Sequence, residues 1–394
     1  MAESERLVEL WKRAKTRGED VYLATVVHVQ GSSYRKPGAR MLVTSSGESA
    51  GTISGGCLEA EVSRRICWLT RDGANLEAYR SSFEDDEGVR YGLGCGGTVW
   101  ILMEAGAAVD KVMHALCLAL EQRTPSVTVS SIAPNRPHTT SVISHIELEH
   151  GSQICACYLQ RARRALREQR AIAAARSADS DVPAFVCIPV IPPPRLHVFG
   201  AGDDAQPVVR LAAELGWDIS VADGRAHLLR QQRFPQTKRL VNLKYGAANS
   251  RQKSMRILTP QPLVEVGDRA VILTHSYEQD KALLRELLPR PLEYLGVLGP
   301  LQRTTRIVDE IKDELGLSRE ECLARLHAPV GLPLGNGDPA VIALSIVAEI
   351  QANASGLLGL DSSRVTSSGR SHAIAMEDKV DRDTDRPEGG NSFI

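Results

Sequence analysis

One segment, RLHVFGAGDDAQPVVRLAAELGW, which begins at Arg195, constrains the fold of this chain more than any other. Its first residues are apolar and predict a buried strand, and the glycines at 200 and 202 predict a tight turn. From Ala205 onward the apolar residues recur at helical spacing. A strand that runs through a glycine-rich turn directly into a helix is typical of an α/β fold that binds ligands at this turn.

Strands and helices continue to alternate after this unit. Apolar strand patterns recur at DISVAD, AVILTH and YLGVLG, and helical patterns cover 279–288 and 301–315. This alternation predicts a Rossmann-like, doubly wound parallel sheet in the C-terminal half of the chain.

The turn itself has the residues that a dinucleotide site requires. Gly200 permits a tight turn, Gly202 lets the backbone approach a pyrophosphate, and Ala205 takes the place of a third glycine at the start of the helix. Asp223 ends the next strand twenty-one positions after Gly202, where a carboxylate accepts hydrogen bonds from ribose hydroxyls. These residues predict binding of NAD or another adenosine nucleotide, and they disfavour NADP.

Three further residues leave alternatives open at this site. His275 ends the strand AVILTH at the ligand-binding edge of the sheet, where it is a candidate acid, base or ligand, or simply a polar residue that begins a helix. Asp203 and Asp204 place negative charge at an anion-binding turn. A scaffold with an empty or repurposed cleft therefore remains an alternative.

The N-terminal half predicts a mixed α/β unit, with strands such as 21–30 and helices such as VDKVMHALCLALEQR. Prolines 192 to 194 favour an extended linker. We expect an N-terminal domain over 1–190, a linker at 191–194, the Rossmann-like domain over 195–358 and a disordered tail over 359–394.

Two cysteines lie among glycines that would let a ligand approach the backbone. Gly55 and Gly56 precede Cys57, which we expect to begin a helix whose exposed N–H groups favour a thiolate, and Cys95 lies in the sequence GLGCGG. The other six cysteines, Cys67 among them, are expected to be packing residues. A zinc site at Cys155 and Cys157 is disfavoured because no second Cys/His pair has the spacing of a zinc finger.

Composition limits the class of partner. A net charge of -1 and an aromatic content of 4% disfavour nucleic-acid and anionic-membrane binding. No stretch has the length of a membrane span, and the N-terminus has the pattern of an amphipathic helix and not of a signal peptide, so we expect a cytoplasmic protein.

Three segments together resemble the XdhC/CoxI family of xanthine dehydrogenase accessory proteins and carbon monoxide dehydrogenase maturation proteins. They are GSSYRKPGARMLVTSSG leading to GTISGGCLEAEV, the turn HVFGAGDDAQPV, and the stretch from YLGVLGPLQRTTRI to LHAPVGLPLGNGDPAVIALSIVAEI. The chain departs from the family pattern at Tyr34, where proline is common, and at Asp203 and Asp204.

The resemblance implies a chaperone, and not an enzyme, that binds molybdenum cofactor, protects it while a cysteine desulfurase adds the sulfido ligand, and inserts it into an apo molybdenum hydroxylase. It also implies a homodimer. Cys57 is the first candidate ligand of molybdenum, because a soft thiolate suits that metal, and Cys95 is the second. Arg35, Lys36 and Arg40 are candidates to bind the cofactor's phosphate.

Two other classes of function stay open. In one, the protein is an NAD-dependent oxidoreductase with His275 as acid or base and the N-terminal half as substrate domain. In the other, it is a non-catalytic scaffold for assembling the parts of a hydroxylase.

Overall fold

The computed structural model describes residues 3–80, 97–133, 137–150, 154–174, 182–249, 252–258, 263–335 and 337–354. These ranges belong to one compact unit, Met1–Leu358, whereas the expected tail at 359–394 lies outside the described residues. None of the helices in the described ranges is long and apolar enough to cross a bilayer.

The first sheet has five strands in the order β3-β2-β1-β5-β4, and its paired neighbours are antiparallel. The strands are β1 (Val21–Gln30), β2 (Arg40–Thr44), β3 (Ser49–Gly51), β4 (Asn75–Arg80) and β5 (Thr98–Ala105). Helices α1 (Glu3–Arg17) and α3 (Ala107–Glu121) pack on the face that carries Leu23 and Leu42. Helix α2 (Glu59–Leu69) packs on the opposite face, against Ala24 and Met41, because successive strand residues point to opposite faces.

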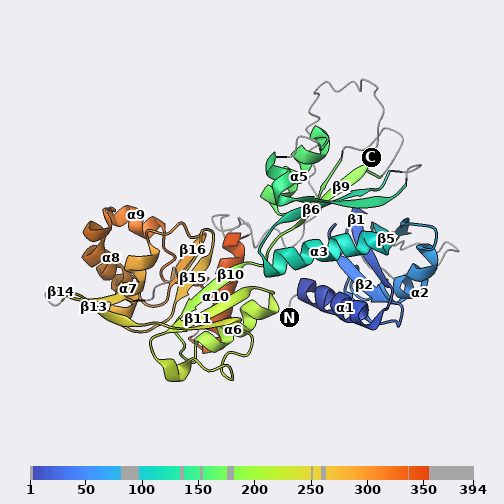
Figure 1. The fold of residues 1–394 in the computed structure, drawn as a ribbon. Coiled ribbons are helices and arrows are strands. Elements are labelled where there is room, and N and C mark those ends of the chain that lie inside the picture. The colour runs from blue at the N-terminus through green and yellow to red at the C-terminus, as the bar shows by residue number, and fades with distance from the viewer. Residues whose placement is uncertain are drawn as a thin grey trace. The chain divides into compact units, whose positions relative to one another are not determined.

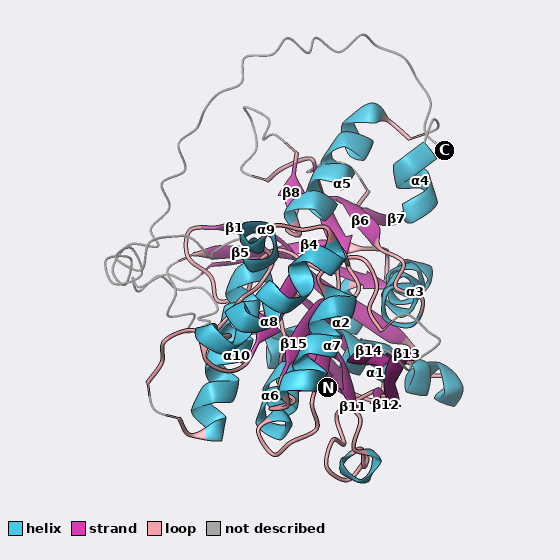
Figure 2. Ribbon diagram, turned by 90° about the vertical axis from the view of Figure 1, so that its left-hand side faces the viewer, coloured by secondary structure: helices cyan, strands magenta, loops and turns pink. Residues whose placement is uncertain are grey.

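A second sheet of the N-terminal half has the order β7-β6-β9-β8. Its strands are β6 (Ser126–Ser131), β7 (Thr139–Ser144), β8 (Ile172–Ala173) and β9 (Phe185–Val190). The short helix α4 (His145–His150) follows β7, and α5 (Ala156–Glu168) lies against β6, β8 and β9. Figure 2 shows α5 beside β8 and β6. The mixed α/β character expected for this half is confirmed.

The C-terminal half contains a parallel sheet in the order β12-β11-β10-β15-β16 (Figure 1). Its strands are β10 (Arg195–Phe199), β11 (Asp218–Asp223), β12 (Arg239–Asn242), β15 (Arg269–Ile272) and β16 (Tyr294–Val297). All four residues of β15 and of β16 are buried, as expected for strands covered on both faces.

Helices cover both faces of this sheet. On one face, α6 (Ala205–Glu214) packs beside α10 (Pro339–Ala354). On the other, α7 (Tyr277–Leu287) and α8 (Leu301–Leu315) share a core with Phe199 and Ile272, and α9 (Arg319–Ala324) packs beside α8. The doubly wound, Rossmann-like architecture is therefore confirmed.

Two details complete the arrangement. An antiparallel hairpin, β13 (Tyr245–Asn249) and β14 (Gln252–Ile257), interrupts the parallel pattern, and the sequence pattern did not predict it. Residues 191–194 connect β9 of one sheet to β10 of the other, and the domain boundary placed there stays a prediction.

Candidate functional site

The glycine-rich segments of the N-terminal half meet at one edge of the first sheet. Strand β1 ends at Gln30, which lies opposite Thr98 at the start of β5. Strand β2 starts at the same edge, where Met41 lies opposite Gly51 at the end of β3. The antiparallel topology thus sends loops 31–39 and 52–58 away from the same side of the sheet.

Close contacts hold these loops together. A side chain at Gly55 would begin 3.9 Å from the ring of Tyr34, and one at Gly97 would lie 2.2 Å from the carbonyl oxygen of Ser32. Glu3 links the two loops, because its carboxylate accepts hydrogen bonds from Arg35 at 2.6 Å and from the Thr52 backbone at 3.0 Å. The edge is therefore one surface built from several segments.

The turn that contains Cys57 is folded around the carboxylate of Glu59, the first residue of α2. That carboxylate accepts hydrogen bonds from the backbone N–H groups of Ile53, Ser54, Gly56 and Leu58 and from the Ser54 hydroxyl, at 2.5 to 3.2 Å. Burial alone would raise the pKa of Glu59, but these bonds outweigh it and hold the pKa below its usual range. The sequence analysis missed Glu59, although an acidic residue in the first turn of a helix is a recognisable signal.

Cys57 lies on the exposed side of this turn. Cys57, Gly55 and Gly56 are all exposed, whereas Ser54 and Leu58 are buried. Gly56 has φ of 111°, and a side chain placed there would meet no atom of the described residues within 4 Å. The turn therefore places Cys57 on the protein surface beside two residues that lack side chains.

The expected reason for a thiolate at Cys57 is not supported. Helix α2 begins at Glu59, two residues later than expected, and the Cys57 N–H donates to the Ser54 hydroxyl at 3.1 Å. The neighbouring N–H groups are occupied by Glu59 and Ser54, so they are not available to an external anion.

The three basic candidates have different surroundings. Arg40 is 8% exposed, donates to Thr128 at 3.1 Å, and has its pKa lowered by burial to about 10, so it faces the interior. Arg35 is paired with Glu3, and its Nε atom has no hydrogen-bond partner within the described part of the chain. Lys36 is exposed and lacks a carboxylate partner among the residues that the structure describes. Of the three, Lys36 is the cation most available to a ligand.

Only some of the other cysteines have the expected surroundings. Cys95 lies outside the described residues. Cys67 and Cys155 are exposed, so the prediction that they are packing residues is wrong, whereas Cys187 and Cys322 are buried as predicted. On α2 the apolar residues Val62 and Ile66 face the core, which turns the neighbouring Cys67 and Trp68 toward solvent.

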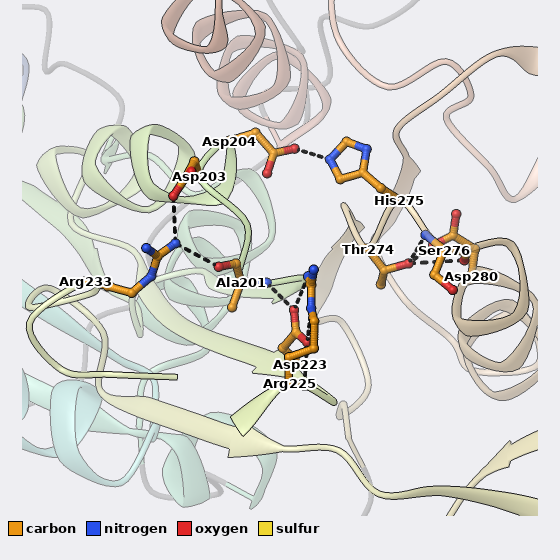
Figure 3. Close-up of polar contacts among 10 residues, drawn as sticks. All are labelled: Ala201, Asp203, Asp204, Asp223, Arg225, Arg233, Thr274, His275, Ser276 and Asp280. Carbon is orange, nitrogen blue, oxygen red and sulfur yellow. Dashed lines mark hydrogen bonds and ion pairs between the residues drawn. The ribbon is translucent and has the colours of Figure 1, made fainter. Parts of the chain in front are cut away.

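The second candidate site is the turn after β10, shown in Figure 3. Gly200 has φ of 124°, and a side chain there would lie 2.4 Å from the carbonyl oxygen of Leu273, so only glycine fits. A side chain at Gly202 would lie 2.7 Å from the Asp204 carboxylate. Ala205 begins α6 and is fully buried. The turn is close to its predicted geometry, but a carboxylate of the protein lies beside Gly202.

Asp223 is at the predicted end of β11, where it is occupied by partners from the chain itself. One oxygen accepts from the Ala201 N–H at 2.7 Å, and both interact with Arg225, whose backbone N–H also donates at 2.7 Å (Figure 3). These bonds outweigh the effect of burial and lower the pKa of Asp223. As the structure stands, Asp223 stabilises the turn.

Two carboxylates beside the same turn have partners from other segments of the chain. His275 lies 2.6 Å from Asp204 through Nε2, and Arg233 lies 2.9 Å from Asp203 (Figure 3). His275 has φ of 59°, a conformation uncommon for residues other than glycine. Nearby, burial raises the pKa of Asp280, which accepts hydrogen bonds from Thr274 and Arg303. The basic side chains His275 and Arg233 therefore already contact carboxylates of the protein, where a dinucleotide needs unoccupied anion-binding groups.

Comparisons with known proteins match both halves of the chain. Residues 14–80 match the XdhC and CoxI family, and residues 196–350 match the XdhC Rossmann domain. A Bacillus subtilis protein, named as a probable component of xanthine dehydrogenase, is 32% identical over 342 residues, which cover 84% of this chain and 92% of that protein. The molybdenum cofactor insertion chaperone PaoD of Escherichia coli is 24% identical over 84% of this chain and 83% of its own length.

A solved structure supports the fold. It is described as a xanthine dehydrogenase from Bacillus halodurans, is 24% identical, and covers 92% of this chain and 98% of its own. Its TM-score of 0.67 indicates a shared fold over that length.

Proposed function

The chain belongs to the XdhC and CoxI family, and from this membership we propose that it is a maturation factor for a molybdenum hydroxylase. It binds molybdenum cofactor as cargo, protects it while a cysteine desulfurase supplies the sulfido ligand, and inserts it into an apoenzyme of the xanthine or carbon monoxide dehydrogenase type. The relative named as a cofactor insertion chaperone, which aligns with 84% of this chain, supports this role.

The observation that carries the proposal is the exposed turn at Cys57. In molybdenum cofactor the metal is bound through sulfur. A soft thiolate is a suitable additional ligand for such a metal. Cys57 lies on a turn whose backbone N–H groups donate hydrogen bonds to the Glu59 carboxylate. Two exposed glycines lie beside it. These residues fit a bulky, flat ligand because no side chain from Gly55 or Gly56 stands in its way.

The surrounding groups have separate tasks in this proposal. The Tyr34 ring is 77% exposed and lies next to Gly55, so it provides an aromatic surface against which a pterin can stack. Lys36, two residues later, supplies the positive charge for a terminal phosphate. Arg40 is left out of this set because it is buried. Cys95 remains a proposed second ligand.

The protein's oligomeric state and its Rossmann domain also have roles in this function. The protein acts as a homodimer, which places two sites before a two-fold symmetric client. NAD or another adenosine nucleotide enters the Rossmann crevice when the Asp204–His275 pair opens.

A pair of cysteine variants tests the role of the Cys57 turn. We expect Cys57→Ala to fold normally and to lose molybdenum cofactor, whereas Cys67→Ala retains it. The two residues make a matched pair because both thiols are exposed and only Cys57 lies beside the glycines. The proteins are purified without oxygen, loaded with cofactor, and compared for bound pterin, bound molybdenum and activation of an apo hydroxylase.

Equal retention by the two variants would exclude Cys57 as the ligand and would direct attention to Cys95. The same preparation separates the other two classes of function. Substrate-linked NADH turnover without bound pterin would indicate an oxidoreductase, and binding of hydroxylase polypeptides without either ligand would indicate a scaffold.

A further inference from the structure

A second sulfur site lies at the start of α5, on the second sheet of the N-terminal half (Figure 1). The Sγ atoms of Cys155 and Cys157 are 2.9 Å apart. Cys155 is exposed and Cys157 is partly buried. Neither residue has a part in the cofactor-binding role proposed above.

Regular backbone structure brings these two sulfurs together. Cys155 is the N-cap residue of α5, with φ of -49° and ψ of 129°, and its carbonyl oxygen accepts from the N–H groups of Tyr158 and Leu159 at 3.0 and 3.1 Å. Tyr158 packs against Phe185 of β9, with ring centroids 4.4 Å apart. The turn that carries the two thiols is therefore anchored to the sheet. A covalent S–S bond measures about 2.0 Å, so the two sulfurs have to approach each other by about 0.9 Å to form one.

The two thiols differ in exposure and in the direction of their pKa shifts, and this difference suits two consecutive steps of thiol–disulfide exchange. Hydrogen bonds from the Cys157 thiol and from backbone N–H groups lower the pKa of the exposed Cys155. Burial, together with the neighbouring sulfur, raises the pKa of Cys157. Since the thiolate is the attacking species, Cys155 is the entry point and Cys157 is the residue that completes the reaction.

We propose that Cys155 and Cys157 form a dithiol site that exchanges with low-molecular-weight disulfides and closes into an intramolecular disulfide. Cys155 loses its proton to water, and its Sγ attacks one sulfur of a disulfide RSSR, whose S–S bond breaks; the RS⁻ that leaves takes a proton from water. Cys157 then loses its proton to water, and its Sγ attacks the Cys155 sulfur of the mixed disulfide; the bond between that sulfur and RS breaks, and the second RS⁻ leaves and takes a proton from water. In total two protein thiols are oxidised and one RSSR is reduced to two RSH.

The neighbouring cysteine Cys187 is not a third member of this site. It is fully buried on β9, and burial raises its pKa to about 12, so it is a poor nucleophile at neutral pH. The structure therefore assigns the chemistry to the pair on α5. Reversible disulfides of this kind in reducing compartments are usually catalytic or redox-sensing.

The test uses the full chain, reduced and then exposed to oxidised glutathione at neutral pH without oxygen. We expect mass spectrometry to show the wild-type protein losing two hydrogen atoms, and peptide mapping to join Cys155 to Cys157. Cys157→Ser should instead accumulate a glutathione adduct on Cys155. Cys155→Ser should react at this site at least about tenfold more slowly, because the exposed thiolate is lost.

Cys67→Ser is the control, since Cys67 is also an exposed thiol on a helix and its sulfur contacts the Tyr22 hydroxyl at 3.3 Å. This variant should form the Cys155–Cys157 link at the wild-type rate. The proposal is overturned if the wild-type protein keeps a stable glutathione adduct without closing the link, or if Cys155→Ser reacts at this site as fast as the wild type.

Discussion

Two glycine-rich turns, one in each half of the chain, follow the same local pattern but differ in what they leave accessible. In the N-terminal half, Glu59 binds the amides of the Cys57 turn from the helix that follows, and the thiol and two glycines stay exposed. In the Rossmann turn, Asp223 binds the Ala201 amide, and Asp204 lies beside Gly202 and pairs with His275.

The difference shows that a glycine-rich turn does not by itself define a ligand site. In both turns a carboxylate of the protein takes a place that an anionic ligand could occupy. At Glu59 this carboxylate shapes the turn and leaves Cys57 and two glycines exposed, whereas Asp204 contacts a residue 71 positions away. On the function proposed above, the N-terminal turn binds its ligand as it stands, and the Rossmann turn does so only when the Asp204–His275 contact breaks.

The largest expected effect is that of Glu59→Ala. Removing the carboxylate leaves three backbone N–H groups, those of Ile53, Ser54 and Gly56, and the Ser54 hydroxyl without this acceptor, whereas the Leu58 N–H keeps the Ser54 hydroxyl. We expect the free energy of unfolding to fall by about 3 to 4 kcal/mol. Urea unfolding of wild type, Glu59→Ala and the control Glu61→Ala measures this effect.

The pH dependence of the Glu59 effect has a defined sign. Since the pKa of Glu59 is lower in the folded state, its contribution is present above the unfolded pKa and is lost as the pH falls through the folded pKa. The difference between wild type and Glu59→Ala should therefore shrink in acid. A variant as stable as the wild type at neutral pH would show that Glu59 does not hold the turn.

A smaller loss is expected for Asp223→Ala. The Ala201 N–H is buried and loses its acceptor, while Arg225 is partly exposed and can be hydrated again. We expect the free energy of unfolding to fall by about 2 to 3 kcal/mol, and the difference to shrink as the pH falls through the lowered pKa of Asp223. Asp218→Ala, at the opposite end of β11, is the control for thermal and urea unfolding.

Nucleotide titration of Asp223→Ala decides between two roles of this residue. If Asp223 also binds ribose hydroxyls, affinity for NAD falls together with stability. Unchanged affinity for NAD would show that Asp223 only stabilises the Rossmann turn. Its role would then be the same as that of Glu59 in the Cys57 turn.

The smallest effect is expected for Asp204→Ala, which removes the carboxylate beside Gly202 and the bridge to His275. Loss of one negative charge next to a pyrophosphate should tighten NAD or ADP binding by about tenfold at low salt. Isothermal titration calorimetry compares the variant with Asp204→Asn, which removes the charge and keeps a polar group. Equal affinity in wild type and Asp204→Ala would show that the carboxylate does not close the crevice.

Much of the architecture is readable from the sequence. The strand at 21–30, the helix at 301–315 and the parallel sheet after Arg195 have the predicted positions, because hydrophobic periodicity and glycine turns act over short stretches. Gly200 is where the turn requires a glycine. The hairpin of β13 and β14 was missed, since it interrupts the alternation of strand and helix.

The surroundings of individual side chains were less readable. Arg40 resembles a surface cation in the sequence, but a strand of another sheet supplies Thr128 and covers it. Cys67 resembles a core residue because Ile66 and Trp68 flank it, although the helix turns only Ile66 inward. Neighbours in the sequence of a helix point to different faces, so flanking residues are a poor guide to burial.

The sequence by itself therefore determined most of the regular elements, the parallel sheet and the place of a cysteine beside two glycines, because those properties depend on residues close together in the chain. The tertiary structure decided which charged side chains have partners within the protein. The pairs Asp204–His275 and Arg40–Thr128 join residues 71 and 88 positions apart, and such partners meet only when whole elements pack. A local sequence pattern indicates which groups could bind a ligand. Packing of the elements decides which of those groups already have partners within the protein.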